Sequence, residues 1–401
     1  MKKCSNIAIK NMHIRLLKKN DDLNQIFELC KQNMMIGENY ATTYDIWDFQ
    51  YNKNPLNKSW NSVVEHEEQI LGHIGLYPLP LRGPQKFFLA GSISNGVLSE
   101  SIRNKLLPFK DKKTFSIIPL IDNCASSAFG DGIDIVFVHS TIHPMIWKAL
   151  KYKNIDVTCK TTYHTGLKGL YQKYHNLLCK KRVIFNGVLG IIFSAILTLT
   201  RVLPMTVTRC SHFLTKNSNR DISICKFDVF DNNFKCFFDQ FNDANKTLVT
   251  YDRNIEYLNW KFSQTQFKKF KININNTLVG YLVLQKNNET NDFDVIDYII
   301  LNKHLNETQF IFNQLSLTEG MSISFTHFLS CEYSESIYNE LNKQGITLSL
   351  NPAHMFSKKQ KITKAPIYFK INNMTNSPIM LDERSWFISP IFFTPSYFLR
   401  P

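Results

Sequence analysis

The stretch RNIEYLNWKF, residues 253–262, interleaves aromatic and charged side chains at a spacing typical of a helix. Tyr257 and Trp260 are three residues apart, so they lie on one face of that helix, with Phe262 beside it. We expect this aromatic face to pack on a sheet. The charged residues are expected to remain in solvent, namely Arg253, Glu256 and Lys261.

The first half of the chain contains a similar stretch, YDIWDFQYNKNP, which begins at Tyr44. Both stretches have an acidic residue, two further residues, Asp or Asn, and then an aromatic residue, which is Phe49 in one and Trp260 in the other. Other matches follow in the same order: ILGHIGLYPLP with LVGYLVLQ, and GIDIVFVH with GMSISFTH. The shared order predicts an internal duplication, and chance likeness among short apolar strands is the alternative.

Hydrophobic periodicity predicts the same succession of elements in both halves. Residues 12–160 are expected to run strand, helix, helix, three strands, helix, strand, helix and strand, and residues 222–350 to repeat this order. The strand IDIVFVH is almost wholly apolar, so we expect it to be buried on both faces. Strands that alternate with helices late in each half favour a mixed α/β sheet.

The run VIFNGVLGIIFSAILTLT, residues 183–200, carries no charged residue and separates the two halves. Its length is at the lower limit for a bilayer span. Three interpretations remain open: a buried or bridging helix between domains, a helix lying on a membrane surface, and a true span. Pro204 is expected to end or kink the helix.

The chain of 401 residues is long enough for two domains, and its formal net charge is +14. A basic chain suggests an anionic partner, such as a membrane surface, a phosphorylated ligand or a nucleic acid. The lysines are spread rather than gathered, so the charge is also compatible with solubility alone. A nucleic acid is the least favoured of these partners.

The nine cysteines are scattered and show neither C-x-x-C pairs nor zinc-finger spacing to histidine. We therefore expect no metal site and reduced thiols, as in a cytoplasmic protein. The first twenty residues have no continuous apolar core, so no signal peptide is predicted there.

The helix RNIEYLNWKF, two following strands with VGY opening the second, and then FDVIDYII resemble the C-terminal half of tandem GNAT-fold proteins found in bacterial polysaccharide gene clusters. Their helix has the pattern R-x-x-E-Y-L-x-W-R-[FY], in which Lys261 stands for the usual Arg. The first half resembles the partner domain, with WDFQYNKNP before ILGHIGLYPLPL. The resemblance covers residues 12–160 and 220–355.

The resemblance implies an α/β (α+β) fold of two GNAT-like domains, each a mixed twisted sheet flanked by helices, joined by an apolar helical linker. The expected parts are an N-terminal domain over 1–165, the linker over 166–215, a C-terminal domain over 216–360 and a tail over 361–401.

GNAT domains hold acyl-CoA where two neighbouring strands separate, so the resemblance implies acetyl-CoA or another acyl-CoA as substrate. The corresponding stretch is SNGVLSESIRNKLLPFKDKK, residues 94–113, and the expected cofactor-binding residues are Val97, Leu98, Ser99, Arg103 and Lys105. The glycines that would let backbone donors approach a pyrophosphate are absent, so binding is expected to be weak. The second half keeps only Lys303 at the equivalent turn.

Three catalytic candidates follow from position. His139 ends the buried strand, where it would point into the cleft, although a hydrogen-bonded structural histidine is the alternative. Tyr152 stands where GNAT enzymes place a tyrosine that protonates the leaving thiolate, although core packing is the alternative. Glu65 is placed to act as a base.

The resemblance implies an acyltransferase that moves an acyl group from acyl-CoA to a small amine, for example an amino sugar in envelope polysaccharide synthesis. The alternative is a degenerate, non-catalytic GNAT pair that binds a ligand or partner. The expected location is the cytoplasm, with contact to the inner face of the membrane through residues 183–200 as an open alternative.

Overall fold

The computed structural model describes thirteen segments of the chain, and all structural statements below concern these. They are residues 12–18, 23–33, 44–84, 86–103, 105–109, 112–139, 144–164, 221–264, 266–286, 293–319, 322–342, 363–372 and 385–388. The apolar run at 183–200 and the strand predicted at 346–350 lie outside them. No helix among the described residues is long and apolar enough to span a bilayer.

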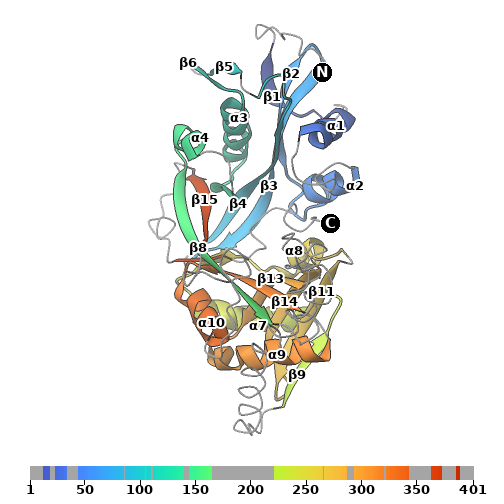
Figure 1. The fold of residues 1–401 in the computed structure, drawn as a ribbon, viewed down its shortest axis with the longest axis vertical. Coiled ribbons are helices and arrows are strands. Elements are labelled where there is room, and N and C mark those ends of the chain that lie inside the picture. Colours follow the sequence, from blue (N-terminus) through green and yellow to red (C-terminus); the bar gives the residue numbers. More distant parts are fainter. Residues whose placement is uncertain are drawn as a thin grey trace, which may run out of the picture.

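The first half follows the predicted succession and adds a short hairpin, β5–β6, before its third helix (Figure 1). Its elements are β1 (His13–Leu16), α1 (Leu23–Asn33), α2 (Tyr44–Trp47), the π-helix η2 (Asp48–Asn52), β2 (Trp60–His66), β3 (Gln69–Arg82), β4 (Phe87–Leu98), β5 (Leu106–Phe109), β6 (Lys112–Phe115), α3 (Ile117–Gly130), β7 (Ile135–His139), α4 (Pro144–Ala149) and β8 (Lys153–His164).

The second half repeats the succession and adds a short strand before its tryptophan helix. Its elements are β9 (Ile222–Lys226), α7 (Asn232–Ala244), β10 (Val249–Tyr251), α8 (Ile255–Lys261), β11 (Phe267–Ile274), β12 (Thr277–Lys286), β13 (Phe293–Ile300), the 3₁₀ helix η3 (Asn302–Glu307), α9 (Thr308–Thr318), β14 (Ile323–Leu329), α10 (Glu332–Asn342), β15 (Thr363–Ile371) and β16 (Trp386–Phe387).

The two halves use the same strand order. The sheet runs β1-β2-β3-β4-β7 through the first half and β14-β13-β12-β11-β9 through the second, with β15 and β8 between them. Within each half the first four strands are antiparallel, and the last pair, β4 with β7 or β13 with β14, is parallel. The α/β prediction of two mixed sheets flanked by helices is thus confirmed.

The halves exchange their last strands at the centre of the sheet. β8 leaves the first half and pairs with β14 of the second, whereas β15 leaves the second half and pairs with β7 of the first. The two strands also pair with each other, from Lys153 to Cys159 of β8. Figure 1 shows β8 running from one half into the other and β15 standing among first-half strands. No strand was predicted in the tail that supplies β15, and the predicted domain boundaries stay a prediction.

The helix α8 packs against the first half, which corrects one prediction. Arg253 and Lys261 were expected in solvent, yet only 6% and 3% of their surfaces are exposed, whereas Glu256 is exposed as expected. Helical periodicity identifies an apolar face, but it gives no sign that a second domain covers the opposite one. Tyr257 Oη donates to the carbonyl of Pro78 on β3 at 2.7 Å, which ties α8 to that domain.

The two aromatic residues matched by the repeat lie against each other. Phe49 and Trp260 stack with ring centroids 5.1 Å apart, and Trp260 Nε1 donates to the carbonyl of Phe49 at 3.2 Å. Nearby, β10 pairs with the end of β3, Thr250 opposite Arg82 and Tyr251 opposite Leu81. The equivalent helices of the two halves therefore meet at the interface between the halves.

Candidate functional site

The strands β4 and β7 pair only where they begin and then separate. Ala90–Ser92 of β4 lie opposite Ile135–Phe137 of β7, and β4 continues to Leu98 with no described strand beside it on that side. β4 also has a bulge, because His73 pairs with Val97 but Gly75 pairs with Ser94. A bulge bends a strand and increases its twist, which carries β4 away from β7. We call this separation the first-half cleft.

A mostly buried group of polar side chains from η2, β2 and β3 gathers around Ser94 of β4, next to this separation. We call Gln50, Tyr51, Asn61, His73 and Ser94 the polar cluster. Gln50 Nε2 donates to Ser94 Oγ at 2.6 Å, and Tyr51 Oη lies 2.8 Å from the same oxygen. His73 Nε2 is 3.2 Å from Asn61 Oδ1. Ser94 is two residues past Ser92, about 7 Å along the strand, so the cluster flanks the point where the cleft opens.

A π-helix and a glycine position the polar cluster. Gln50 and Tyr51 belong to η2, and single π-turns of this kind occur mostly at functional sites. Tyr51 Oη lies directly over Gly75, since a Cβ atom at that position would be 2.1 Å from the hydroxyl. The tyrosine reaches β4 because β3 has no side chain in its path.

A surface pocket of about 370 Å³ adjoins the polar cluster at Tyr51. Its other lining residues are mainly polar: Asn52, Asn57, Lys58, Ser59, Trp60 and Asp131. The Trp60 indole N–H donates to the carboxylate of Asp131 at 2.7 Å, which fixes that carboxylate at the pocket. The pocket thus offers one anionic group, one cationic group in Lys58, and several amide and hydroxyl groups.

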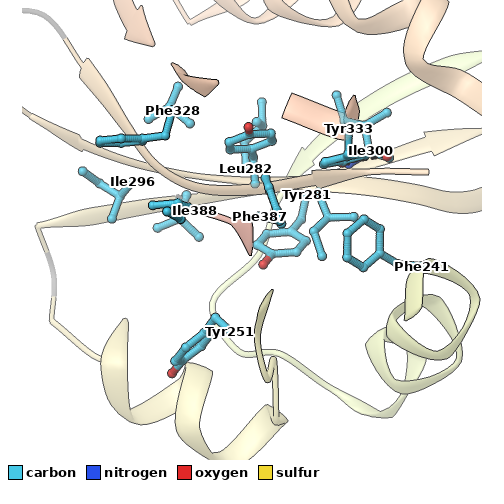
Figure 2. Packing of buried hydrophobic residues seen from close by; sticks show 14 of the residues in the cluster. Phe241, Tyr251, Tyr281, Leu282, Ile296, Ile300, Phe328, Tyr333, Phe387 and Ile388 are labelled. Carbon is cyan, nitrogen blue, oxygen red and sulfur yellow. Dashed lines mark hydrogen bonds between the residues drawn. The ribbon is translucent and has the colours of Figure 1, made fainter. Parts of the chain in front are cut away.

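In the second half, β13 and β14 separate in the same way, after Asp294 and Ser324. Here a tyrosine of α10 occupies the separation. Tyr333 Oη accepts from the amide N–H of Ile300 and donates to its carbonyl, both at 2.9 Å. Phe387 packs on Tyr333 with ring centroids 4.9 Å apart (Figure 2). The second-half cleft is therefore filled by the protein's own side chains.

A buried ion pair stands where the first half has its polar cluster. Arg253 Nη2 lies 2.9 Å from Asp297 Oδ1, and both side chains are almost fully buried. Tyr281 Oη donates to Asp297 Oδ2 at 2.5 Å and accepts from Arg253 Nε at 2.8 Å. Burial opposes the charge on Arg253, but Asp297 and Tyr281 outweigh it and hold the Arg253 pKa above its usual value.

Several solved structures resemble the chain over most of its length. A probable N-acyltransferase from Enterococcus faecalis has a TM-score of 0.52 at 7% identity, covering 90% of this chain and 73% of its own. A GCN5-related N-acetyltransferase from Anabaena variabilis has 0.51 at 9%, covering 93% and 75%. Saccharomyces cerevisiae N-myristoyltransferase with bound myristoyl-CoA has 0.52 at 10%, covering 94% and 90%.

The chain has the GNAT fold. At such low identity the likeness establishes the fold alone. No protein-family model matches the sequence, and no curated protein sequence does. The parallel strands that separate in each half are the places where the GNAT resemblance predicted an acyl-CoA site.

The predicted catalytic residues occupy different parts of the GNAT fold. His139 is the last residue of β7, at the first-half cleft, and pairs with Ile367 of β15. Tyr152 follows α4 and is buried in the core beside Trp147, and its hydroxyl has no hydrogen-bond partner among the described residues. Burial raises the pKa of Tyr152 well above its usual value, so it keeps its proton.

Glu65 lies away from these two residues. It belongs to β2, which is separated from β4 by β3, and its carboxylate binds the guanidinium of Arg15 on β1. His13 Nε2 is 3.6 Å from the same carboxylate. The structure therefore brings His139 to the cleft and holds Tyr152 in the adjoining core, but keeps Glu65 in an ion pair at the edge of the sheet.

The predicted cofactor-binding residues follow one another at the end of β4. Val97 and Leu98 are buried, and the Ser99 amide N–H donates to the Leu71 carbonyl at 2.8 Å. The turn that follows holds Arg103, which is exposed, and Lys105, which is partly buried. Instead of a glycine loop, the chain then forms the hairpin β5–β6 before α3 begins.

Sequence reasoning missed the polar cluster and the second-half ion pair. The cluster joins residues 43 and 44 positions apart, and no local pattern reports such a contact. One signal was present: Gly72 and Gly280 were matched in the repeat, and His73 and Tyr281 directly follow them. No group of His, Cys, Asp or Glu able to hold a metal ion occurs among the described residues.

Proposed function

We propose that the chain is a GNAT-type N-acyltransferase that holds acyl-CoA in the first-half cleft and transfers the acyl group to a small amine. One observation carries the proposal. The first-half cleft opens beside a buried polar cluster, whereas Tyr333 occupies the equivalent opening in the second half. The likeness in fold to acyltransferases supports acyl transfer as the reaction class by analogy.

The proposed reaction begins when the amine nitrogen attacks the thioester carbonyl. A protonated amine first gives up one proton to water, because only the neutral nitrogen can attack. The carbon–sulfur bond then breaks, the nitrogen loses a second proton and the thiolate gains one. A backbone N–H of the β4 bulge would polarise the carbonyl. Tyr152 would protonate the thiolate; burial keeps its phenol neutral before the transfer but also makes it a weaker acid than a free tyrosine. The proton lost by the amine as the amide forms would pass to His139 or to the polar cluster. Within the cluster His73 would accept it, either directly or through water.

The pocket beside Tyr51 would receive the acceptor. A protonated amine is attracted to the carboxylate of Asp131, and sugar hydroxyls can bond with the asparagine and serine side chains of the lining. An amino sugar of envelope polysaccharide synthesis has both kinds of group. Replacing Asp131 by Asn should raise the KM for the amine and leave the KM for acyl-CoA unchanged in steady-state assays.

A comparison of two matched variants tests the donor site. Calorimetry with acetyl-CoA should show that Arg103→Ala loses about 1.5–3 kcal/mol of binding free energy, the value of a charged hydrogen bond. The control is Lys303→Ala, at the equivalent turn of the second half, which should bind like the wild type. Equal losses in both variants, or none in either, contradict a first-half site.

The alternative function is a non-catalytic GNAT pair that binds a ligand or partner. The hairpin β5–β6 favours it, because a strand stands where glycines would admit a pyrophosphate. If wild-type protein gives no heat with millimolar acetyl-CoA and none with longer acyl-CoA, the non-catalytic function is supported instead.

A further inference from the structure

The hairpin β5–β6 is a structural addition to the first half that the acyltransferase proposal leaves unexplained. In the second half, β13 is followed by the short helix η3 and then by α9, with no hairpin between them. β5 and β6 form a two-stranded sheet of their own, separate from the main sheet. Figure 1 shows them at the end of the first half that is farthest from the second.

The hairpin is fixed to the body of the protein at its base. The hydroxyl of the buried Ser116, which precedes α3, donates to the carbonyl of Ile102 at 2.7 Å and approaches that of Lys105 at 3.4 Å. These bonds join the two ends of the insertion and so fix the base of the hairpin to the start of α3. An isolated two-stranded hairpin is marginally stable in water and benefits from a surface that covers it.

Two large apolar side chains are exposed next to each other on the hairpin. Leu106 and Phe115 are directly paired across the two strands, and their exposed fractions are 42% and 48%. A cross-strand pair lies close enough to form one apolar contact area. No other part of the described chain covers the exposed fractions of these two side chains.

The sequence around this apolar pair is strongly basic. Residues 103–113, RNKLLPFKDKK, contain one acidic residue, Asp111, against five basic ones: Arg103, Lys105, Lys110, Lys112 and Lys113. Exposed Leu and Phe next to several Lys and Arg are what a peripheral protein presents to an anionic bilayer. The apolar side chains enter the boundary with the acyl chains, and the cations attract the headgroups.

We infer that the hairpin β5–β6 is a docking element for an anionic lipid bilayer. The charge of the segment selects this occupant over an apolar protein surface, because clustered lysines are disfavoured at the core of protein interfaces. This inference does not depend on the proposed acyltransferase function. It uses no residue of the apolar run at 183–200, which lies outside the described residues.

Vesicle flotation of the full-length protein tests the inference. Wild-type protein should float with vesicles of phosphatidylcholine and phosphatidylglycerol, bind phosphatidylcholine alone weakly, and dissociate as salt rises. The double variant Lys112→Glu/Lys113→Glu should lower the partition coefficient about thirtyfold or more, since each lysine near the surface contributes about fivefold. Leu106→Ser/Phe115→Ser should lower it about tenfold.

Matched controls separate the hairpin from general effects of charge and of apolar exposure. Lys235→Glu/Lys246→Glu makes the same charge change at two exposed positions, one on α7 and one in the turn after it, and Val229→Ser removes another exposed apolar residue of the second half. Both should bind vesicles like the wild type. Thermal melts check the fold of every variant. Wild-type protein that ignores anionic vesicles, or hairpin variants that bind no worse than the controls, would overturn the inference.

Discussion

The two clefts of this molecule have the same backbone plan and different contents. In each half a parallel pair of strands separates after two or three residue pairs, at the same position in the strand order. In the first half the separation adjoins Ser94 with its hydrogen-bonded neighbours, whereas in the second it is filled by Tyr333 and Phe387. The shared fold thus preserves the separation of the two strands in both halves, but the side chains that adjoin or fill it differ.

The polar residues of the two halves correspond by register. Ser94 pairs with Gly75, three residues after Gly72, and Asp297 pairs with Val283, three residues after Gly280. The same place in the sheet therefore holds a neutral hydrogen-bonded network in one half and an ion pair in the other. A buried ion pair that is fully hydrogen-bonded orders its surroundings, so we interpret the second half as the structural partner.

The largest effect should come from breaking the second-half ion pair. Asp297→Ala leaves the buried guanidinium of Arg253 without its carboxylate, and we expect a loss of about 3–5 kcal/mol in the free energy of unfolding. Urea denaturation measures this loss. As a control, Asp243→Ala removes an exposed partner of Lys246 and should cost less than about 1 kcal/mol. A similar small cost for both variants would show that the buried pair does not organise this half.

Removing the hydroxyl that fills the second-half cleft should have the next largest effect. Tyr333→Phe takes a hydrogen-bond partner from both the N–H and the carbonyl of Ile300, for a cost of about 2–3 kcal/mol. The exposed Tyr44, changed to Phe, should leave stability unchanged. If Tyr333→Phe unfolds like the wild type, the hydroxyl does not hold the cleft closed. Gain of acetyl-CoA binding by this variant would contradict the assignment of the donor site to the first half.

A glycine substitution tests the first-half arrangement. In Gly75→Ala the new Cβ would lie 2.1 Å from Tyr51 Oη, so the tyrosine must leave Ser94, and we expect a cost of about 2 kcal/mol with loss of acyl transfer. The control is Gly96→Ala, where the nearest atom is 3.5 Å from the new Cβ, and it should be close to neutral. Full activity in a stably folded Gly75→Ala protein would remove the polar cluster from the site.

The smallest effect concerns the lysine between the halves, and it depends on pH. Lys261 is buried with its Nζ 5.2 Å from the centre of the Tyr77 ring, and burial lowers its pKa from 10.5 to about 7. The unfolded chain therefore binds more protons between pH 7 and 10.5, so this group makes stability rise with pH across that window. We expect the free energy of unfolding of Lys261→Met to exceed that of the wild type by about 1 kcal/mol at pH 7.

The pH profile distinguishes this effect from simple repacking. The advantage of Lys261→Met should diminish as the pH rises from 7 towards 10.5, because the free energy needed to neutralise the amine on folding falls as the pH approaches the unfolded-state pKa. Lys235→Met, at an exposed site on α7, should show no such trend in the same series of melts. An advantage that stays constant with pH would mean that folding does not shift the pKa of Lys261 and that packing alone distinguishes the two proteins.

Local sequence patterns were sufficient to predict the helices and strands but insufficient to predict the contacts between them. Alternation along β11 and the apolar run of β7 gave strands where the structure has them, and the repeated order indicated the matching halves. The burial of Lys261 was mispredicted because it depends on the first half covering α8, and that of Arg253 because it depends on Asp297 and Tyr281, which are distant in sequence. The bond of Tyr333 to Ile300 joins positions 33 residues apart and follows from no periodic signal.

The donor site shows the same limit. By analogy, Val97 to Lys105 could be assigned to the donor site, and the structure places them at the end of β4 and in the turn after it. The polar cluster could not be found, because Ser94 and Gly75 look unremarkable until η2 brings Tyr51 over them. Side-chain chemistry at a site emerges from tertiary contacts, whereas strand and helix signals are local.

The exchange of β8 and β15 has a consequence for biosynthesis. A ribosome releases the first half long before it has made residues 363–371, so β7 must wait with an unpaired edge while the whole second half is synthesised. Exposed edges of this kind pair readily with other chains. The nascent protein therefore passes through a stage in which its most aggregation-prone strand is complete and its intended neighbour does not yet exist. The sheet of the first half is completed only when β15, residues 363–371, pairs with β7.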